Sequence, residues 1–263
     1  MRVTVNGVDL LVEQTGEGDD VLFISGLADE GACWVDQVSG LSDRYRVTTF
    51  DNRGVGQSST PEGEFRITDF ATDTLALMDS LGLEQAHVVG SSMGGAIAQE
   101  LALAAPERVR SLVLNGTWCR GDRFLHEVFR SWIWTARKAD SIRDFLVGVN
   151  LWCFAPRIWN EGIMDGWIDA AEVSPNAQSV DAFCRSAEAL IAHDSAERVG
   201  AISAPALVTV GELDLVLPER FSRDLVERIP GARLVVIPDV GHQPFQETPD
   251  DYNRLLLDFW AGV

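Results

Sequence analysis

The chain of 263 residues is poor in positive charge. Only 21 Lys and Arg residues stand against 40 Asp and Glu residues, which gives a formal net charge of −19 at pH 7. Nucleic acids and anionic membrane surfaces attract basic proteins, so this balance argues against a general affinity for either. We interpret the negative charge as a source of solubility, and we expect a small-molecule substrate, no nucleic acid and no membrane as partners.

Targeting segments, long apolar runs and paired cysteines are also missing. The N-terminus "MRVTVNGVDLLVEQTG" alternates apolar and polar residues and lacks the basic and then apolar run of a secretory signal. No apolar run is long enough to span a bilayer. The few cysteines are far apart and show no CxxC spacing, so neither zinc nor a disulfide framework is indicated. We expect reduced thiols in a cytoplasmic protein; the cysteines are Cys33, Cys119, Cys153 and Cys184.

Apolar patterning predicts eight strands and an α/β fold. Short strands come first, and from residue 65 strand and helix patterns alternate up to residue 116 and again from about residue 206. Such alternation is typical of a mostly parallel sheet with helices on both faces. The predicted strands of the first fifty residues are Arg2–Val5, Val8–Glu13, Val21–Ile24 and Tyr45–Phe50.

The middle of the chain has a different character. From residue 117 to residue 198 the strand pattern disappears and helical, aromatic-rich sequence replaces it. We therefore predict a core domain formed by residues 1–116 and 199–263, with residues 117–198 inserted as a helical cap. Most of the aromatic side chains are expected to form the core of this cap, and a minority to line a pocket beneath it. The segment holds six of the eight tryptophans: Trp118, Trp132, Trp134, Trp152, Trp159 and Trp167.

The stretch "VVGSSMGGA", residues 88–96, offers a candidate nucleophile. An apolar strand, then Gly-x-Ser-x-Gly, then an alanine-rich helix is the setting of a nucleophile elbow, whose tight turn needs small residues two before and two after the serine. Gly90 and Gly94 satisfy this for Ser92, whereas Ser91 would have Val89 and Met93. The motif alone leaves open a turn that merely packs closely or binds phosphate.

A serine nucleophile needs a base, and the base needs an acid to orient it. Of the four histidines, only His242 directly follows a predicted strand, where a loop brings it to the carboxyl edge of the sheet. Asp214 follows the preceding strand and reaches the same edge, with Glu212 as a second choice. Parallel sheets bind ligands at this edge, and the chain order Ser92, Asp214, His242 agrees with this arrangement.

With these motifs, the sequence resembles the α/β-hydrolase superfamily over essentially its whole length. Besides "GSSMGG", the resemblance includes "ISGLADEGACW", "FDNRGVGQSSTP", "GELDLVLP" and "GHQPFQETP". It implies an α/β-hydrolase fold with an inserted helical lid. It also implies an oxyanion hole formed by the main-chain N–H groups of Leu27 and Met93, although Ser25-Gly26 replaces the usual His-Gly pair. Structural roles are implied for Trp34, for Asp194 and for a turn formed by Asp51, Arg53, Gly54 and Gly56.

The expected activity is hydrolysis of a carboxylic ester or lactone of a small to medium, largely apolar substrate through an acyl-enzyme on Ser92, without a metal or organic cofactor. Two alternatives stay open. A carbon-carbon bond hydrolase of ring-cleavage diketone acids uses the same triad, but its relatives usually carry a tryptophan soon after the histidine, where this chain has Gln243, Pro244 and Phe245. Such relatives also have an arginine in the lid that binds a substrate carboxylate, and the predicted cap offers several candidates: Arg120, Arg123, Arg130, Arg137, Arg143, Arg157 and Arg185. The other is a ligand-binding receptor with little turnover. The sequence leaves both a monomer and a homodimer open.

Overall fold

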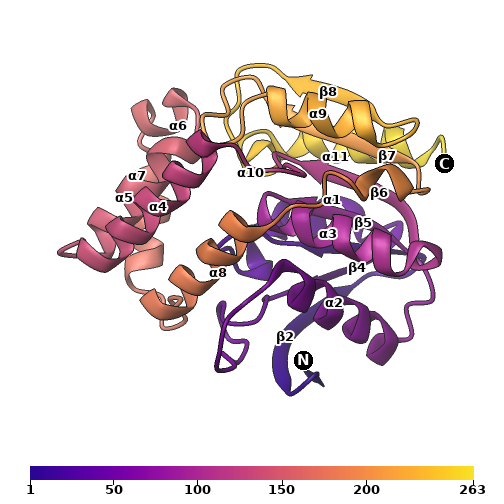
Figure 1. Cartoon of the computed structure of the whole chain (residues 1–263), viewed down its shortest axis with the longest axis horizontal. Coiled ribbons are helices and arrows are strands. Elements are labelled where there is room, and N and C mark those ends of the chain that lie inside the picture. The colour runs from indigo at the N-terminus through magenta and orange to yellow at the C-terminus, as the bar shows by residue number, and fades with distance from the viewer.

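A sheet of eight strands forms the centre of the molecule in a computed structural model that describes residues 1–263 (Figure 1). The strand order is β1-β2-β4-β3-β5-β6-β7-β8; β2 runs antiparallel to its neighbours and all other pairs are parallel. The predicted mostly parallel, eight-stranded sheet is therefore confirmed. The strands are β1 Arg2–Val5, β2 Val8–Thr15, β3 Asp19–Ile24, β4 Tyr45–Phe50, β5 Ala86–Ser91, β6 Val109–Asn115, β7 Ala206–Gly211 and β8 Arg233–Ile237.

Both faces of the sheet are buried, as the continuous apolar strands require. Side chains alternate along each strand, so Leu22 and Ile24 belong to one apolar cluster and Val21 and Phe23 to the other. The second cluster includes residues of α1 (Val35–Leu41) and α11 (Pro249–Trp260), which pack together. The first cluster includes residues of the helices on the opposite face, α2 (Ile67–Leu81), α3 (Met93–Ala104) and α9 (Arg220–Arg228). Four further short helical turns lie in the connections: η1 Gly31–Trp34, η2 Pro106–Arg108, η3 Val199–Ala201 and α10 Pro244–Glu247.

Five helices lie between β6 and β7 and stand to one side of the sheet (Figure 1). Local sequence starts three of them: the side chains of Asp122, Ser141 and Ser179 each accept a hydrogen bond from a main-chain N–H of the first turn. The helices occupy the segment predicted to be a cap, and its standing as a separate domain remains a prediction. None of the helices in the chain is both long and apolar enough to cross a membrane. The five are α4 Arg123–Lys138, α5 Ile142–Cys153, α6 Pro156–Asn160, α7 Ile163–Glu172 and α8 Val180–Ala192.

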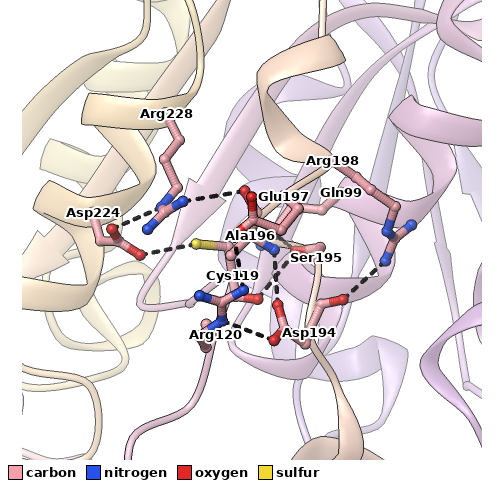
Figure 2. A network of polar contacts seen from close by, with 10 residues as sticks. All are labelled: Gln99, Cys119, Arg120, Asp194, Ser195, Ala196, Glu197, Arg198, Asp224 and Arg228. Carbon is pink, nitrogen blue, oxygen red and sulfur yellow. Dashed lines mark hydrogen bonds and ion pairs between the residues drawn. The ribbon is translucent and has the colours of Figure 1, made fainter.

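The connection that leaves β6 and the one that returns to β7 run side by side, held by the polar network of Figure 2. Ser195 N donates to the Cys119 carbonyl oxygen at 2.7 Å, and Arg120 Nε donates to Asp194 Oδ2 at 2.8 Å. The Ser195 hydroxyl donates to Gln99 Oε1 of α3 at 2.8 Å. The two ends of the helical segment are thus fastened to each other and to α3, and Asp194 takes part in this structural link.

Trp34 joins the loop after β3 to the C-terminal helices. Its side chain is fully buried and stacks on Phe245 with ring centroids 3.9 Å apart, while Phe23 of β3 lies at 4.7 Å. Its Nε1 donates to Ser25 Oγ at 3.1 Å. The indole therefore fixes this loop through both packing and a hydrogen bond.

We expect Trp34→Ala to lower the free energy of unfolding by about 3–5 kcal/mol, because it removes a fully buried aromatic side chain and leaves a cavity. Urea unfolding followed by far-UV circular dichroism measures the change. The control is Trp134→Ala, whose side chain is 66% exposed and should change stability by no more than about 0.5 kcal/mol. Equal losses in the two variants would contradict this packing role.

Candidate active site

Ser92 lies at a sharp turn between β5 and α3. Its backbone has φ 54° and ψ −115°, a conformation that non-glycine residues rarely adopt and that structures retain where the surroundings enforce it. A Cβ at Gly90 would collide with the Gly94 carbonyl oxygen, and one at Gly94 with the Ile24 carbonyl oxygen of β3. The spacing that singled out Ser92 in the sequence thus corresponds to two backbone contacts that only glycine permits.

Asp214 and His242 meet beyond the ends of β7 and β8. His242 Nδ1 lies 2.7 Å from Asp214 Oδ2, and the two residues are 3% and 4% exposed. The other carboxylate oxygen, Oδ1, accepts from the main-chain N–H groups of Val216 and Leu217 at 2.9 and 2.8 Å. These bonds stabilise an ionised Asp214, which holds the proton on Nδ1 and leaves Nε2 free to accept one.

The environment of His242 favours its protonated form. Burial alone would lower the pKa of the imidazole, but the charge of Asp214, its hydrogen bond and the charge of Asp29 together raise that pKa above the ordinary value of 6.5. The imidazole is therefore a stronger base than a histidine in water, as a general base that must deprotonate a hydroxyl requires.

The end of β6 links the serine turn to the histidine loop. The main-chain carbonyl oxygen of Asn115 accepts a hydrogen bond from Ser92 N at 2.9 Å. Its side-chain Nδ2 donates to Ser91 Oγ at 2.9 Å and to the main-chain carbonyl oxygen of His242 at 3.3 Å. Gly116 follows, and a Cβ there would lie 2.9 Å from His242 Nδ1. The hydroxyl of Ser92 forms no hydrogen bond with His242 here; such contacts often tighten only when substrate binds.

The loop after β3 supplies the first of the two predicted oxyanion donors, and α3 supplies the second. The main-chain N–H groups of Leu27 and Met93 donate no hydrogen bond within the protein. Where related loops have histidine, Ser25 ties this loop together: its hydroxyl accepts from Trp34 Nε1 at 3.1 Å and donates to the Glu30 carbonyl oxygen at 3.4 Å. The substitution therefore preserves an internal hydrogen-bonded loop and leaves two N–H groups available.

Asp51, which follows β4, fixes the same loop from its other side. One carboxylate oxygen accepts from Gly31 N at 2.7 Å and the other from Gln57 N at 2.9 Å. Gly56 has φ 54°, and a Cβ at this position would collide with the carboxylate. The "DNRGVG" motif thus forms the structural turn that the resemblance implied.

The histidine loop is bound to the inserted helices. His242 N donates to the Cys153 carbonyl oxygen at the end of α5 at 2.7 Å. Glu247 Oε1 accepts from Gly241 N at 2.8 Å and from Ala155 N at 3.2 Å, so one buried carboxylate joins both segments. Burial raises the pKa of Glu247 above its usual value, although these main-chain hydrogen bonds oppose the shift.

A cavity of about 750 Å³ lies between the loop after β3 and the inserted helices. Fourteen of its 22 lining residues are hydrophobic, which suits a largely apolar ligand. Ser92 and His242 are not among the lining residues; the cavity approaches them at Asp29. As expected, few aromatic residues of the inserted segment line it: Phe145, Trp167 and Phe183.

All charged side chains that line this cavity are acidic: Asp29, Glu30 and Asp140. The arginines of the inserted segment, the candidates for binding a substrate carboxylate, do not line it. A negatively charged ligand would be repelled here, whereas neutral and cationic ligands would not. No group of three or more His, Cys, Asp or Glu side chains is arranged to hold a metal ion.

The remaining sequence candidates lie elsewhere. Glu212 is exposed after β7, and its carboxylate accepts from Asp239 N at 3.3 Å rather than contacting His242. His87 lies near the start of β5, at the end of the strand away from Ser92, and is paired with Val21 of β3. Burial there lowers the pKa of His87 to about 4. His126 lies in α4 and His193 just beyond α8. Asp214 is therefore the acid that the geometry pairs with the base.

Sequence reasoning missed three residues of the site. Asn115 ends an apolar strand and carried no signal beyond its polarity. Glu247 lies in the quoted motif "GHQPFQETP", five residues after His242, and its position there could have suggested a role. Asp29 stands two residues after Leu27 and is followed by Glu30, and ionisable residues this close to a predicted oxyanion donor are themselves a signal.

Comparisons with known proteins agree with this fold. A family model described as alpha/beta hydrolase fold matches residues 20–142. A protein of Azorhizobium caulinodans named "Putative carbamate hydrolase RutD" is 33% identical, covering 97% of this chain and 96% of its own. The enol-lactonase from Burkholderia xenovorans superposes with a TM-score of 0.90 at 28% identity, over 99% of this chain and 100% of that one. The meta-cleavage product hydrolase CumD from Pseudomonas fluorescens gives 0.86 at 26% identity, over 100% and 97%.

We expect Gly94→Ala to lower the free energy of unfolding by about 1–3 kcal/mol or more, because the new methyl group must displace the backbone of β3. Urea unfolding measures the change. Gly166→Ala in α7 is the matched control: nothing lies within 4 Å of its Cβ, and alanine's higher helix propensity should stabilise it by up to about 1 kcal/mol. A Gly94→Ala midpoint equal to wild type would refute the close contact at the elbow.

Proposed function

Because this chain belongs to the α/β-hydrolase family, we propose that it is a serine hydrolase that cleaves a carboxylic ester or lactone through an acyl-enzyme on Ser92. The observation that carries the proposal is the buried Asp214–His242 pair, linked through Asn115 to a strained serine turn. A serine hydroxyl needs a base to activate it, and an oriented imidazole needs a hydroxyl to act on. The apolar cavity supports a small to medium, largely apolar substrate.

In the proposed mechanism, His242 Nε2 removes the proton of the Ser92 hydroxyl as its oxygen attacks the substrate carbonyl carbon. Asp214 keeps the imidazole oriented and stabilises the imidazolium that forms. The N–H groups of Leu27 and Met93 bind the negative oxygen of the tetrahedral intermediate, and His242 then donates its proton to the leaving alcohol. Water, deprotonated by His242 in turn, attacks the acyl-enzyme and releases the acid.

Relatives of this chain bear names that imply carbamate, enol-lactone and meta-cleavage product hydrolysis, so the family alone does not select the bond. The charge of the cavity provides a criterion. A ring-cleavage diketone acid carries a carboxylate at neutral pH, and the cavity presents Asp29, Glu30 and Asp140 with no cationic partner. We therefore favour neutral esters and lactones over carbon-carbon cleavage. The receptor alternative leaves the Asp214–His242 pair without a purpose.

Ser92→Ala should lower kcat/KM for p-nitrophenyl butyrate by about 10⁴-fold or more, because the variant has no nucleophile. Ser91→Ala is the control: its hydroxyl accepts a hydrogen bond from Asn115, so its loss should cost no more than about tenfold if only packing changes. A fluorophosphonate probe should label wild type at Ser92.

Unimpaired turnover by Ser92→Ala, or a label on any other residue, would show that the nucleophile is misassigned. Release of one equivalent of p-nitrophenol without further turnover would favour the receptor alternative. Faster cleavage of a vinylogous diketone acid than of short esters and lactones by wild type would favour the carbon-carbon hydrolase.

The acid limb of kcat/KM should lie above pH 6.5, because the active form needs a neutral imidazole and the pKa of His242 is raised. Activity is thus present above that pKa and is lost as the pH falls through it. In Asp214→Asn the limb should move to lower pH, since the main charge that raises this pKa is gone, while kcat falls by about 10⁴-fold. Initial rates between pH 5 and 9 measure both effects; a limb that stays in place would exclude His242 as the titrating base.

A further inference from the structure

Asp29 places a carboxylate beside the nucleophile. It lies two residues after Leu27, the proposed oxyanion donor, and lines the cavity. A Cβ at Gly26 would lie 2.8 Å from Asp29 Oδ2 and 3.5 Å from Ser92 Cβ, so the carboxylate and the serine flank the same small space. Asp29 is therefore the ionisable residue of the cavity wall that stands next to the serine turn.

The bonds of Asp29 differ from those of a structural carboxylate. Its only side-chain hydrogen bond comes from Gln243 Nε2 to Oδ2 at 3.2 Å, and its Oδ1 has no partner in the protein. Asp51 and Asp214, by contrast, each accept two main-chain N–H groups. Gln243 is 6% exposed, and its Oε1 is buried without a partner, although buried polar groups are normally satisfied. Asp29 itself is partly exposed and lines the cavity, so its unpaired Oδ1 is open to a ligand there.

The folded protein disfavours the charge of Asp29. Burial raises its pKa above the usual 3.8, and the Gln243 hydrogen bond and the charge of His242 offset this only in part. An acid whose pKa is raised on folding destabilises the folded state at all pH values above its unfolded pKa. A carboxylate that costs stability, at the wall of a cavity and next to a nucleophile, has the properties of a group kept for binding or catalysis.

We propose that Asp29, oriented by Gln243, is a specificity-determining residue whose free oxygen accepts a hydrogen bond from an O–H or N–H of the substrate within two bonds of the scissile carbonyl carbon. The inference rests on the proposed function and narrows it. The substrate class is then α-hydroxy or α-amino esters and lactones, or carbamates, rather than simple acyl esters. The aromatic residues that line the cavity, Phe145, Trp167 and Phe183, would contact the apolar remainder of the substrate.

Methyl mandelate and methyl phenylacetate form a matched pair of probes, because they differ by one α-hydroxyl group. We expect wild type to prefer the better mandelate enantiomer by about 10- to 100-fold in kcat/KM, as a hydrogen bond to a charged group allows. In Asp29→Leu this ratio should fall to about 1, and in Asp29→Asn, which keeps a neutral acceptor, to an intermediate value. No preference in wild type, or an unchanged preference in Asp29→Leu, would overturn the proposal.

Two controls separate recognition from folding. Asp140→Asn removes another carboxylate that lines the cavity but comes from the helical segment, and it should keep the wild-type ratio. Urea midpoints should show Asp29→Leu to be as stable as wild type or more so, because a disfavoured charge is removed. A large loss of stability, with the ratio unchanged, would assign Asp29 a structural role instead.

Binding to Ser92→Ala, measured by isothermal titration calorimetry, tests this subsite without any turnover. The same preference for mandelate, abolished by adding Asp29→Leu, would support the subsite even if wild type hydrolysed neither ester, and the proposed hydrolytic function would then be the one that fails. If wild type hydrolysed both esters with equal binding and equal rates, the proposed hydrolase function would be supported and the proposed Asp29 subsite would be excluded.

Discussion

The close approach of three backbone segments at the end of β5 is the constraint on which the rest of this structure depends. Gly90 contacts the start of α3, and Gly94 contacts the end of β3, so strand, turn and helix meet without any side chain between them. This contact enforces the positive φ of Ser92. It also places the free N–H of Met93 at the beginning of a helix, where the partial positive charge favours a developing anion.

The same constraint explains why the remaining groups come from loops at one edge of the sheet. Parallel strands end side by side, so the loops after β3, β6, β7 and β8 converge on the turn after β5. Asn115 makes this convergence specific. Its main-chain carbonyl oxygen and its side chain both bond the serine turn, and the side chain also bonds the histidine loop. Asn115 therefore fixes the position of the strained serine relative to a histidine that lies 150 residues away in the sequence.

Sequence reasoning reached the sheet, its mostly parallel order and the residues expected to form a triad, because each depends on local signals: alternation, glycine spacing and position after a strand. It assigned no role to Ser91, whose partner Asn115 is distant in the chain. It also missed Asp29 and Glu247. Their positions in the motifs offered a signal, but their roles depend on burial and on contacts with Gln243 and with the end of α5, which only the fold brings together. The division into core and cap and the catalytic roles themselves remain predictions.

The proposed base, His242, and the proposed recognition residue, Asp29, are connected through the same loop. The loop that carries His242 is hydrogen-bonded to Cys153 and, through Glu247, to Ala155 of the helical segment, while the next residue, Gln243, orients Asp29 at the cavity. A shift of the helices would therefore move the imidazole and the carboxylate together. In the proposed mechanism, His242 must lie within hydrogen-bond reach of the proton that it removes, so this coupling would let the helical segment govern rate as well as affinity.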